Sequence, residues 1–336
     1  MKAYELHKIS EQVEVRLQPT RPRPQLNHGE VLIRVHAASL NFRDLMILAG
    51  RYPGQMKPDV IPLSDGAGEI VEVGPGVSSE VQGQRVASTF FPNWRAGKIT
   101  EPAIEVSLGF GMDGMLAEYV ALPYEATIPI PEHLSYEEAA TLPCAALTAW
   151  NALTEVGRVK AGDTVLLLGT GGVSMFALQF AKLLGATVIH TSSSEQKLER
   201  VKAMGADHLI NYRNSPGWDR TVLDLTAGRG VDLVVEVGGA GTLERSLRAV
   251  KVGGIVATIG LVAGVGPIDP LPLISRAIQL SGVYVGSREM FLSMNKAIAS
   301  AEIKPVIDCC FPIDEVGDAY EYMRSGNHLG KVVITI

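Results

Sequence analysis

The sequence is poor in features that mark several classes of protein. It contains only 3 cysteines in 336 residues, and two of them, Cys309 and Cys310, are adjacent. That number is too small for a disulfide framework and predicts a reducing, cytoplasmic location. The formal net charge is only −6. Such mild acidity argues against nucleic acid or an anionic membrane as a main partner.

Long apolar runs are also missing. The N-terminal segment alternates charged and apolar residues, whereas a signal peptide requires an uninterrupted apolar stretch. The longest uncharged run, 252–268, is interrupted by glycines and falls short of the roughly 18 strongly apolar residues of a membrane-spanning helix. Because 46% of the residues are hydrophobic, disorder is excluded, and we expect a soluble globular protein of about two domains.

The first third of the chain has the pattern of β-structure. In the segment 30–40, Val31, Ile33 and Val35 alternate with polar residues, as in a strand with one buried face. Residues 90–114 lose this pattern and predict a long surface loop. At Ser135 a capping-box pattern, SYEE, predicts the start of a helix.

From Thr164 onward, apolar segments with the length of strands alternate with helical patterns. The predicted strands are 164–169, 187–191, 208–212, 231–237, 254–260 and 278–286. Helices are expected at 176–184, 195–204, 218–226 and 243–250. This alternation predicts a doubly wound α/β fold with a parallel sheet buried on both faces.

A glycine-rich turn follows the first of these strands. Gly169 allows the tight turn, Gly171 lets a pyrophosphate approach the backbone, and the N–H groups of the helix beginning near Gly172 and Val173 face the phosphate charge. Ser174 replaces the usual third glycine and is still small. This strand–turn–helix pattern predicts a dinucleotide site.

The end of the second strand indicates which dinucleotide is preferred. NAD-binding folds place an acid about 20 residues after the glycine turn to hold the ribose 2′-OH, but here the strand runs into Ser192, Ser193 and Ser194. Hydroxyls and a cation suit a 2′-phosphate, so the sequence favours NADP(H). A helix cap at Ser194 and a solvated lysine are the alternative interpretation. In the NADP(H) interpretation, Lys197 supplies the positive charge of the 2′-phosphate pocket, and Tyr212 and Arg213 complete that pocket.

Several segments together resemble the medium-chain dehydrogenase/reductase superfamily over essentially the whole chain. They are SLNFRDLMILAGRYPG (39–54), GAGEIVEVGPGV (66–77), LPCAALTAWNAL (142–153), GTGGVS (169–174) and KLERVKAMGADHLINY (197–212). The resemblance is strongest to zinc-free quinone oxidoreductase-like and alcohol dehydrogenase-like members. LNFRD also resembles the enoyl-reductase domains of polyketide synthases.

This resemblance implies a particular organisation of the chain. It implies a β-rich GroES-like catalytic domain at 1–125, a Rossmann domain at 126–290, and a return to the catalytic domain at 291–336. Substrate is expected in the cleft between the domains. Relatives commonly form homodimers or homotetramers through the edges of their Rossmann sheets, which would place 280–285 at the interface.

The resemblance also bears on metal binding. Zinc-bearing relatives use a Cys, a His-Glu pair and a second Cys, but the first three positions are Asn41, Ser64 and Asp65 here, and only Cys144 matches. Because a catalytic zinc needs three protein ligands, no metal is predicted. The cysteines of the structural zinc lobe are absent from 90–114 as well.

The matched motifs imply further site residues, and most have a structural alternative. Asn41 is expected near the nicotinamide, or it pins its loop. Asp44 is a candidate acid but is favoured as a cap, and Tyr52 is either a proton donor or a packed turn residue. Asp65 is expected to face the position of the missing metal. The remaining cofactor contacts implied by the resemblance are Thr148, Gly238, Gly239 and Gly260.

These features favour hydride transfer from NADPH to a conjugated carbonyl acceptor, a quinone or an α,β-unsaturated ketone or aldehyde. Without a metal to polarise an alcohol, an acceptor that delocalises the incoming charge itself is the better substrate. One alternative is an NAD(P)-dependent alcohol or aldehyde dehydrogenase, including a zinc-using one. Another is a catalytically idle NADPH-binding protein.

Overall fold

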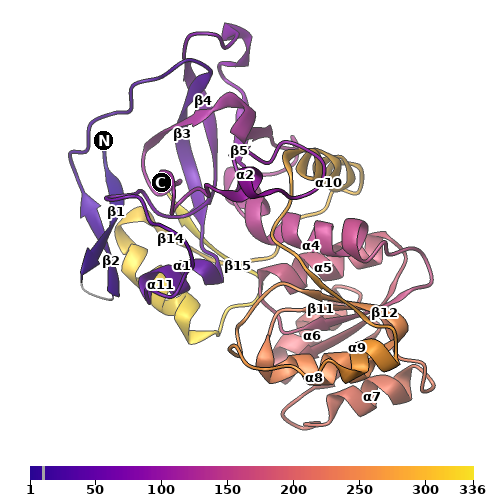
Figure 1. Cartoon of the computed structure of the whole chain (residues 1–336). Helices are drawn as coiled ribbons and strands as arrows, with labels where there is room; N and C mark the ends of the chain where they lie inside the picture. Colours follow the sequence, from indigo (N-terminus) through magenta and orange to yellow (C-terminus); the bar gives the residue numbers. More distant parts are fainter. Residues whose placement is uncertain (10–11) are drawn as a thin grey trace. The chain divides into compact units, whose positions relative to one another are not determined.

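The computed structural model describes residues 1–9 and 12–336 and divides into two compact units. The first unit combines Met1–Leu147 with Val285–Ile336, and the second consists of Thr148–Tyr284. Both ends of the chain lie in the first unit, where indigo and yellow elements meet (Figure 1). The C-terminal tail therefore belongs to the same compact unit as the N-terminal residues.

The first unit is built around a seven-stranded sheet. Its strand order is β14-β15-β3-β4-β5-β7, and β6 pairs with the free part of β3. The strands are β3 (Glu30–Ser39), β4 (Asp65–Val73), β5 (Arg85–Ser88), β6 (Tyr119–Pro123), β7 (Thr127–Pro129), β14 (Ile307–Pro312) and β15 (Lys331–Thr335). A separate hairpin pairs β1 (Ala3–Ile9) with β2 (Gln12–Gln18).

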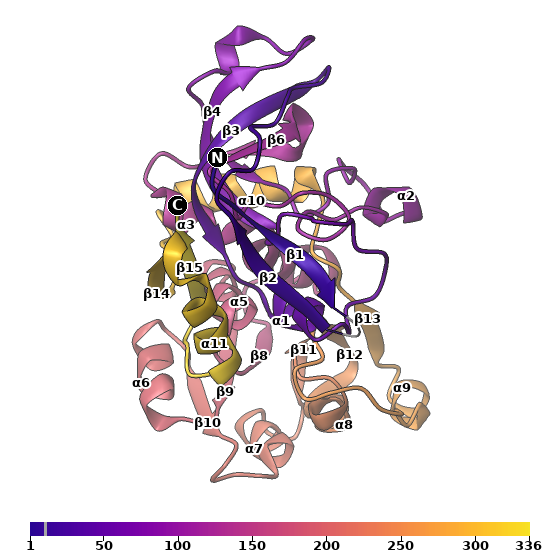
Figure 2. The ribbon, with the colours of Figure 1, turned by 90° about the vertical axis from the view of Figure 1, so that its left-hand side faces the viewer.

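Short helices follow or cover these strands. The α-helices of the first unit are α1 (Phe42–Leu48), α2 (Glu101–Ile104), α3 (Tyr136–Ala139), α10 (Arg288–Ser300) and α11 (Val316–Ser325), and η3 (Leu142–Ala146) is a π-helix. Three short 3₁₀ helices are η1 (Ser79–Val81), η2 (Tyr124–Ala126) and η5 (Ile313–Glu315). In Figure 2, α11 lies beside β14 and β15, against which it packs.

The core of the first unit follows from the predicted alternation in β3. Val31, Ile33 and Val35 are buried, while Arg34 between them is exposed. They join apolar side chains from β4, β6, α11 and β15 in one cluster. Removing these side chains from water is the main favourable contribution to folding of this unit.

The second unit contains the predicted parallel sheet. Its order, β10-β9-β8-β11-β12-β13, matches the 3-2-1-4-5-6 order of doubly wound dinucleotide-binding sheets. The strands are β8 (Thr164–Leu168), β9 (Thr187–Ser192), β10 (His208–Asn211), β11 (Val231–Glu236), β12 (Val250–Thr258) and β13 (Gln279–Gly282). The helices are α4 (Leu147–Asn151), which starts at the boundary, η4 (Ala152–Val156), α5 (Gly172–Leu183), α6 (Glu195–Ala203), α7 (Trp218–Leu225), α8 (Ala240–Ala249) and α9 (Leu271–Ser275).

Two expectations differ from the structure in detail. The proposed domain boundary after residue 125 falls inside the first unit, because α3 and η3 pack against β3, β4 and β5. The segment 90–114 is not only a surface loop: Phe90, Phe91 and Phe110 are buried.

Among the described residues, no helix combines the length and the apolar character that crossing a membrane requires.

Candidate active site

A buried polar cluster lies in the first unit where β15, β3 and β4 run side by side. The strand register pairs Ser39 of β3 with Val333 of β15 on one side and with Asp65 of β4 on the other. Two residues further along, where β3 ends, Asn41 comes opposite Lys331 at the start of β15. The cluster therefore joins residues that are 290 positions apart in the sequence.

Lys331 and Asn41 form the centre of this cluster, and both are buried. The ammonium group of Lys331 donates to the Leu40 carbonyl and, at 2.6 Å, to Oδ1 of Asn41. Nδ2 of Asn41 makes no hydrogen bond within 3.5 Å to the described part of the chain. The structure thus leaves one buried amide donor available for a ligand.

Asp65 lies next to this pair and is fully buried. Oδ1 accepts from the Ser64 hydroxyl at 2.7 Å, and Oδ2 accepts from the backbone N–H of Cys144 at 3.0 Å. That N–H belongs to the first turn of η3, where helical N–H groups have no intrahelical partner. Asp65 therefore acts as a helix cap as well as a member of the cluster.

Burial and charge act against each other in the cluster. Burial raises the pKa of Asp65 and lowers the pKa of Lys331, and the attraction between these two groups opposes both shifts. Burial and the negative charge of Asp65 raise the pKa of the Cys144 thiol far above its usual range. The thiol consequently stays protonated at neutral pH.

Asp44 serves mainly as a cap. Its Oδ2 accepts from the backbone N–H of Asn41 at 2.7 Å, which closes the first turn of α1. Burial raises the pKa of Asp44 to about 6, against the opposing effects of Arg43 and of this N–H donor. The geometry is that of the capping role favoured from the sequence.

Tyr52 lies in a packed aromatic environment. Its ring meets Phe110 edge-on with 5.0 Å between centroids, and the Arg43 guanidinium stands 4.7 Å from its ring centre. Arg43 also donates to the Leu108 carbonyl and to the Ser107 hydroxyl. These contacts suit the interpretation of Tyr52 as a packed turn residue, and they anchor 107–110 to α1.

The cluster does not fit a catalytic zinc. To bind zinc here, Asn41 would have to offer Oδ1 to the metal as a ligand. This oxygen already accepts a hydrogen bond from the ammonium group of Lys331. Cys144 supplies the one thiol of this cluster, and both carboxylate oxygens of Asp65 already accept hydrogen bonds from the chain, so three free protein ligands are not available. The four charged side chains Asp44, Asp65, Arg43 and Lys331 balance one another, so a dication would add two uncompensated charges.

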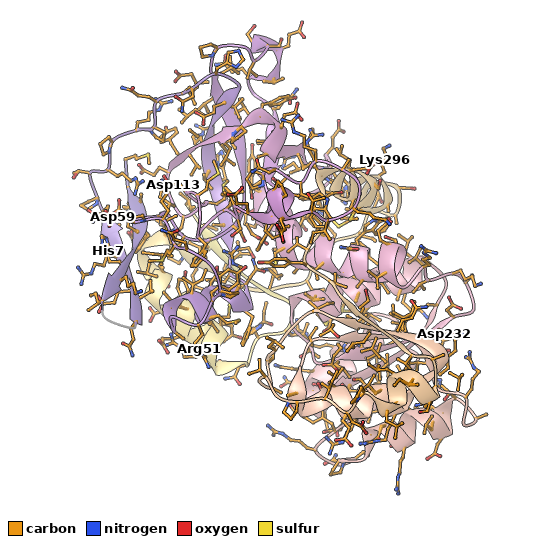
Figure 3. The ribbon with its side chains drawn as sticks, viewed as in Figure 1. His7, Arg51, Asp59, Asp113, Asp232 and Lys296 are labelled. Atoms are coloured by element: carbon orange, nitrogen blue, oxygen red, sulfur yellow. The ribbon has the colours of Figure 1, made fainter. Side chains whose placement is uncertain are left out.

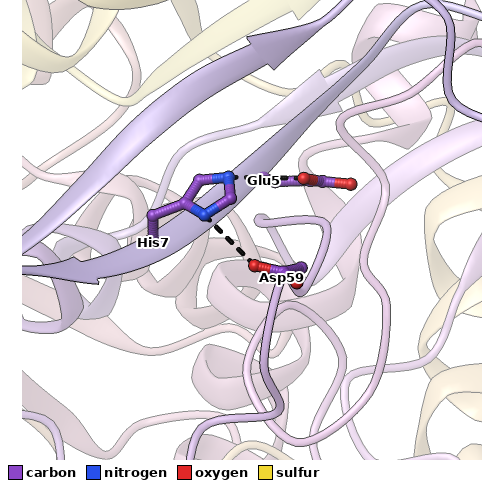
Figure 4. A group of neighbouring side chains, drawn as sticks. All are labelled: Glu5, His7 and Asp59. Carbon is purple, nitrogen blue, oxygen red and sulfur yellow. Dashed lines mark ion pairs between the residues drawn. The ribbon is translucent and has the colours of Figure 1, made fainter.

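A second group of potential metal ligands lies in the first unit. Among the described residues, one group of three ligand types, Glu5, His7 and Asp59, has its ligand atoms within 4.8 Å of one another. Figure 3 places His7 and Asp59 close together in the first unit, together with Asp113. Figure 4 shows each ring nitrogen of His7 facing a different carboxylate, at 3.3 Å from Glu5 and 3.1 Å from Asp59. Because the two ring nitrogens point to different carboxylates, the ligand atoms do not converge on one ion position through the ring.

The glycine turn of the second unit joins β8 to α5. Gly169 has a φ of +69°, a conformation that favours glycine. Gly171 caps α5 with an ordinary φ of −77°, and a Cβ there would meet no described atom within 4 Å. The fold itself gives no reason for glycine at 171, and open space at a helix N-terminus is what a phosphate group requires.

Two buried side chains hold this turn in shape. The Ser174 hydroxyl donates to the Leu168 carbonyl at 2.7 Å, and Nε2 of His190 lies 2.7 Å from the Gly169 carbonyl. Burial lowers the pKa of His190 to about 4, so the ring is neutral at pH 7 and donates through Nε2. The turn is therefore fixed before any cofactor binds.

At the end of β9 no acid is present. The register brings Ser192 beside the end of β10, where the Tyr212 N–H donates to the Ser192 carbonyl at 3.0 Å. Ser194 caps α6 by accepting from the Lys197 N–H, as its structural alternative expected. The first acid, Glu195, accepts from the side chains of Asn211 and Asn214. Ser193 directly precedes that cap.

The turn after β11 is organised by Glu236, which is fully buried. This carboxylate accepts from the N–H groups of Gly238 and Gly239 and from the hydroxyls of Thr242 and Ser246. A Cβ on Gly238 would come within 2.2 Å of Thr242. Close packing within the fold thus accounts for glycine at 238.

Three other predicted cofactor residues have less distinctive surroundings. A Cβ on Gly260 would lie 2.5 Å from the Val237 carbonyl, so packing accounts for this glycine too. Thr148 is buried in α4, at the first position of the second unit. Val173, in the first turn of α5, is partly exposed.

Three important residues were missed from the sequence. Lys331 follows a glycine at the start of a strand, which is typical of an exposed strand end. His190 and Glu236 lie in or at the end of apolar strands, and a polar residue inside a buried strand was a usable signal for both. For Lys331 the sequence offers no comparable signal.

A mainly antiparallel sheet domain combined with a six-stranded parallel sheet that carries an open glycine turn is the architecture of two-domain nicotinamide-dependent oxidoreductases. Residues 27–132 match the family model of the alcohol dehydrogenase GroES-like domain, and residues 172–300 match that of zinc-binding dehydrogenases. The chain belongs to the medium-chain dehydrogenase/reductase superfamily, as the motifs indicated.

Individual relatives cover nearly the whole chain. A zinc-type alcohol dehydrogenase-like protein of Schizosaccharomyces pombe is 46% identical over 93% of this chain and 92% of its own length. The 2-methylene-furan-3-one reductase of Solanum lycopersicum is 33% identical over 93% of this chain and 73% of its own length. A mycobacterial protein solved in complex with NADPH has a TM-score of 0.83 and 29% identity, covering 100% of both chains.

Proposed function

We propose that this protein is an NADP(H)-dependent reductase that transfers a hydride from NADPH to a conjugated carbonyl acceptor, a quinone or an α,β-unsaturated ketone or aldehyde, without a metal. The observation that carries the proposal is the hydrogen bond from the ammonium group of Lys331 to Oδ1 of Asn41, which leaves the buried Nδ2 of the same amide as a donor for the acceptor. A relative that reduces a methylene-furanone and another that binds NADPH support it.

The residues of the first unit suit stabilisation of negative charge on oxygen. When NADPH is bound, it supplies a hydride to the electrophilic carbon, and the displaced electron pair moves to the carbonyl oxygen. Nδ2 of Asn41 is a buried donor that can hydrogen-bond this oxyanion in a site of low dielectric. A proton taken up from solvent then completes the enol or hydroquinone, so that one hydride and one proton are added in total.

The residues of the second unit suit the dinucleotide. Gly169, Gly171, Gly172, Val173 and Ser174 would receive the pyrophosphate at the N-terminus of α5. The hydroxyls of Ser192 and Ser193 with Lys197 and Tyr212 would surround the 2′-phosphate. Glu195, the nearest acid, is engaged by two asparagine side chains and is not offered to the ribose.

We also propose that two copies associate through the edge of the parallel sheet. β13 is the outer strand of the parallel sheet. Apolar side chains that precede β13 in the sequence are exposed, with Val265 and Ile274 each 79% accessible. Covering such a patch with a second copy would remove it from water. A reducing, cytoplasmic location is proposed from the free state of all three cysteines.

The decisive experiment combines turnover with metal analysis. Purified protein is dialysed against a chelator, its zinc content is measured by mass spectrometry, and NADPH oxidation is followed with 1,2-naphthoquinone and with a simple enone. We expect full turnover with zinc far below one atom per chain.

Two other outcomes would replace the proposal. Oxidation of primary alcohols that requires one zinc per chain would identify a zinc-dependent alcohol dehydrogenase, the class that the Schizosaccharomyces pombe relative is named as resembling. Tight NADPH binding without turnover across a broad panel of acceptors would identify an idle binding protein. Sedimentation of the apo and NADPH-bound protein tests the dimer, and a monomer would refute it.

A further inference from the structure

A lysine buried in a strand needs a reason, because lysine is almost never fully buried unless its charge is paired. Lys331 is 3% exposed. Its entry into β15 is fixed by Gly330, where φ is +85° and a Cβ would lie 2.2 Å from the Val306 carbonyl. The backbone therefore holds Lys331 in one place and directs its long side chain into the polar cluster.

The chemistry of an ammonium group determines how Asn41 is oriented. A lysine ammonium has three donors and no acceptor, whereas an asparagine amide has a carbonyl acceptor on one side and an NH₂ donor on the other. Only Oδ1 can face Lys331, and the bond of 2.6 Å shows that it does. Nδ2 is then committed to the opposite side of the amide, where it makes no hydrogen bond to the described part of the chain.

We propose that Lys331 is a positioning residue for the reduction, holding the Asn41 amide so that Nδ2 donates to the developing oxyanion of the acceptor. This inference rests on the proposed function, since it assigns the residue that orients the donor of that same site. Lys331 does not touch the acceptor. Its charge is balanced within the cluster by Asp65 and Asp44, with Cys144 and Arg43 as the other titratable neighbours.

Without Lys331, either side of the Asn41 amide can face the cluster, and the donor is lost in part of the molecules. A small displacement of a catalytic group costs up to roughly 100-fold in rate. We expect Lys331→Met to lower kcat by roughly 10- to 100-fold while the KM for NADPH stays within about twofold, because the glycine turn is untouched. Lys331→Arg keeps a donor-only cation and should retain more activity than Lys331→Met.

A matched control is available in the second unit. Lys251 also lies on a strand, β12, and its ammonium group binds the Asp232 carboxylate. Lys251→Met removes an ion-paired strand lysine outside the proposed site, so kcat should remain near that of the wild type. An equal loss in both variants would mean that general destabilisation explains the effect, and would overturn the proposal.

Chemical rescue separates positioning from folding. Lys331→Ala leaves space for a small cation, so propylammonium should restore part of kcat, whereas tetramethylammonium, which has no N–H donor, should not. Equal effects of the two cations would overturn the proposal. If Lys331→Met does not fold, Lys331→Gln provides a neutral donor of similar length, and its kcat is expected between those of the alanine variant and the wild type.

A spectroscopic readout distinguishes failure of this inference from failure of the proposed function. In protein labelled with ¹⁵N-asparagine, the side-chain NH₂ signal of Asn41, assigned from its loss in Asn41→Ser, should shift in Lys331→Met and stay in place in Lys251→Met. If no acceptor is reduced but this shift occurs, the proposed function fails and the orientation of Asn41 by Lys331 stands. If Lys331→Met reduces the acceptor at the wild-type rate without the shift, the inference fails.

Discussion

The two units assemble their candidate functional residues in opposite ways. In the second unit, Gly169–Ser174 are consecutive, and the helix that follows supplies free N–H groups by itself. In the first unit, Asn41, Asp65, Cys144 and Lys331 come from the end of β3, from β4, from η3 and from the last strand. A local turn can be changed one residue at a time, whereas a cluster of balanced charges responds as a whole.

The units also place their buried titratable groups differently. His190 is kept neutral beneath the glycine turn and has its pKa lowered to about 4, while Asp44 caps α1 and has its pKa raised to about 6. Desolvation is the leading cause in both. Because one group is a base and the other an acid, the same cause gives the two units opposite responses to pH.

The largest expected effect tests the glycine turn. Gly171→Val should weaken NADPH binding by at least roughly 100-fold, or ~3 kcal/mol, because the added side chain occupies the space of the phosphate. The fold should tolerate it apart from a cap cost of about 1 kcal/mol, because φ is ordinary and the chain leaves the space open. Calorimetric titration with NADPH and thermal unfolding measure both quantities.

Gly238→Ala provides the comparison for stability. Its Cβ would press on Thr242 at 2.2 Å, so stability should fall more than it does in Gly171→Val. Unchanged NADPH affinity in Gly171→Val would contradict the assignment of the turn.

The pH response of the second unit is expected to follow His190. Its folded pKa of about 4 lies below the ordinary 6.5, so between these values the unfolded state binds more protons. Stability should therefore fall as the pH drops from 6.5 to 4, by about 3 kcal/mol in total. Urea unfolding of wild type and His190→Gln across this range measures it, and the variant should have lost this dependence. Parallel curves would refute the assignment.

The first unit should respond to pH with the opposite sign through Asp44. Its folded pKa of about 6 lies above the ordinary 3.8, so the folded state holds the proton in this window. Its contribution to stability is greatest below pH 3.8 and declines as the pH rises through 6, by about 3 kcal/mol. Asp44→Asn should remove this decline, leaving stability that increases more steeply with pH. Hydrogen exchange of the β3 amides from pH 4 to 7 compares the stability of the wild type with that of Asp44→Asn. A stability difference that does not change with pH would contradict this prediction.

A smaller effect is expected at the adenosine end of the cofactor. Lys197→Ala should weaken NADPH binding by roughly 1–3 kcal/mol, the value of a charge-assisted hydrogen bond, and leave NADH nearly unaffected. Fluorescence titration with both cofactors provides the comparison. Equal losses of affinity for NADPH and NADH would contradict a contact between Lys197 and the 2′-phosphate. They would favour the alternative interpretation, in which Ser194 is only the cap of α6.

The smallest effect is expected at Cys144. Its thiol is protonated, and it is the backbone N–H, not the sulfur, that binds Asp65. Cys144→Ser should keep kcat/KM within about twofold, since an OH for SH exchange is nearly isosteric and leaves the backbone bond in place. Complete loss of activity would reveal a mechanism that uses the thiol or a metal. A single residue would then be essential in the first unit as well, and the contrast between a local turn and a charge-balanced cluster would be lost.

Much of the architecture was accessible from the sequence alone. The alternation of strands and helices after Thr164, the glycine turn and the missing acid after β9 are local patterns, and their meaning depends on neighbours within about 30 residues. The superfamily motifs added the return of the C-terminal tail. Segment 90–114 was harder, because its buried aromatic residues contact α1 through Arg43 rather than through any sequence neighbour.

The sequence by itself determined the fold class and the dinucleotide turn, because strand burial, helix periodicity and glycine conformation are short-range properties. Only the tertiary structure decided what surrounds Asn41. The antiparallel register of β15, β3 and β4 brings Lys331 and Asp65 to that amide, and no local pattern encodes which strands become neighbours. Whether a buried asparagine donates or accepts depends on those neighbours, because its two ends differ only in the partners they require.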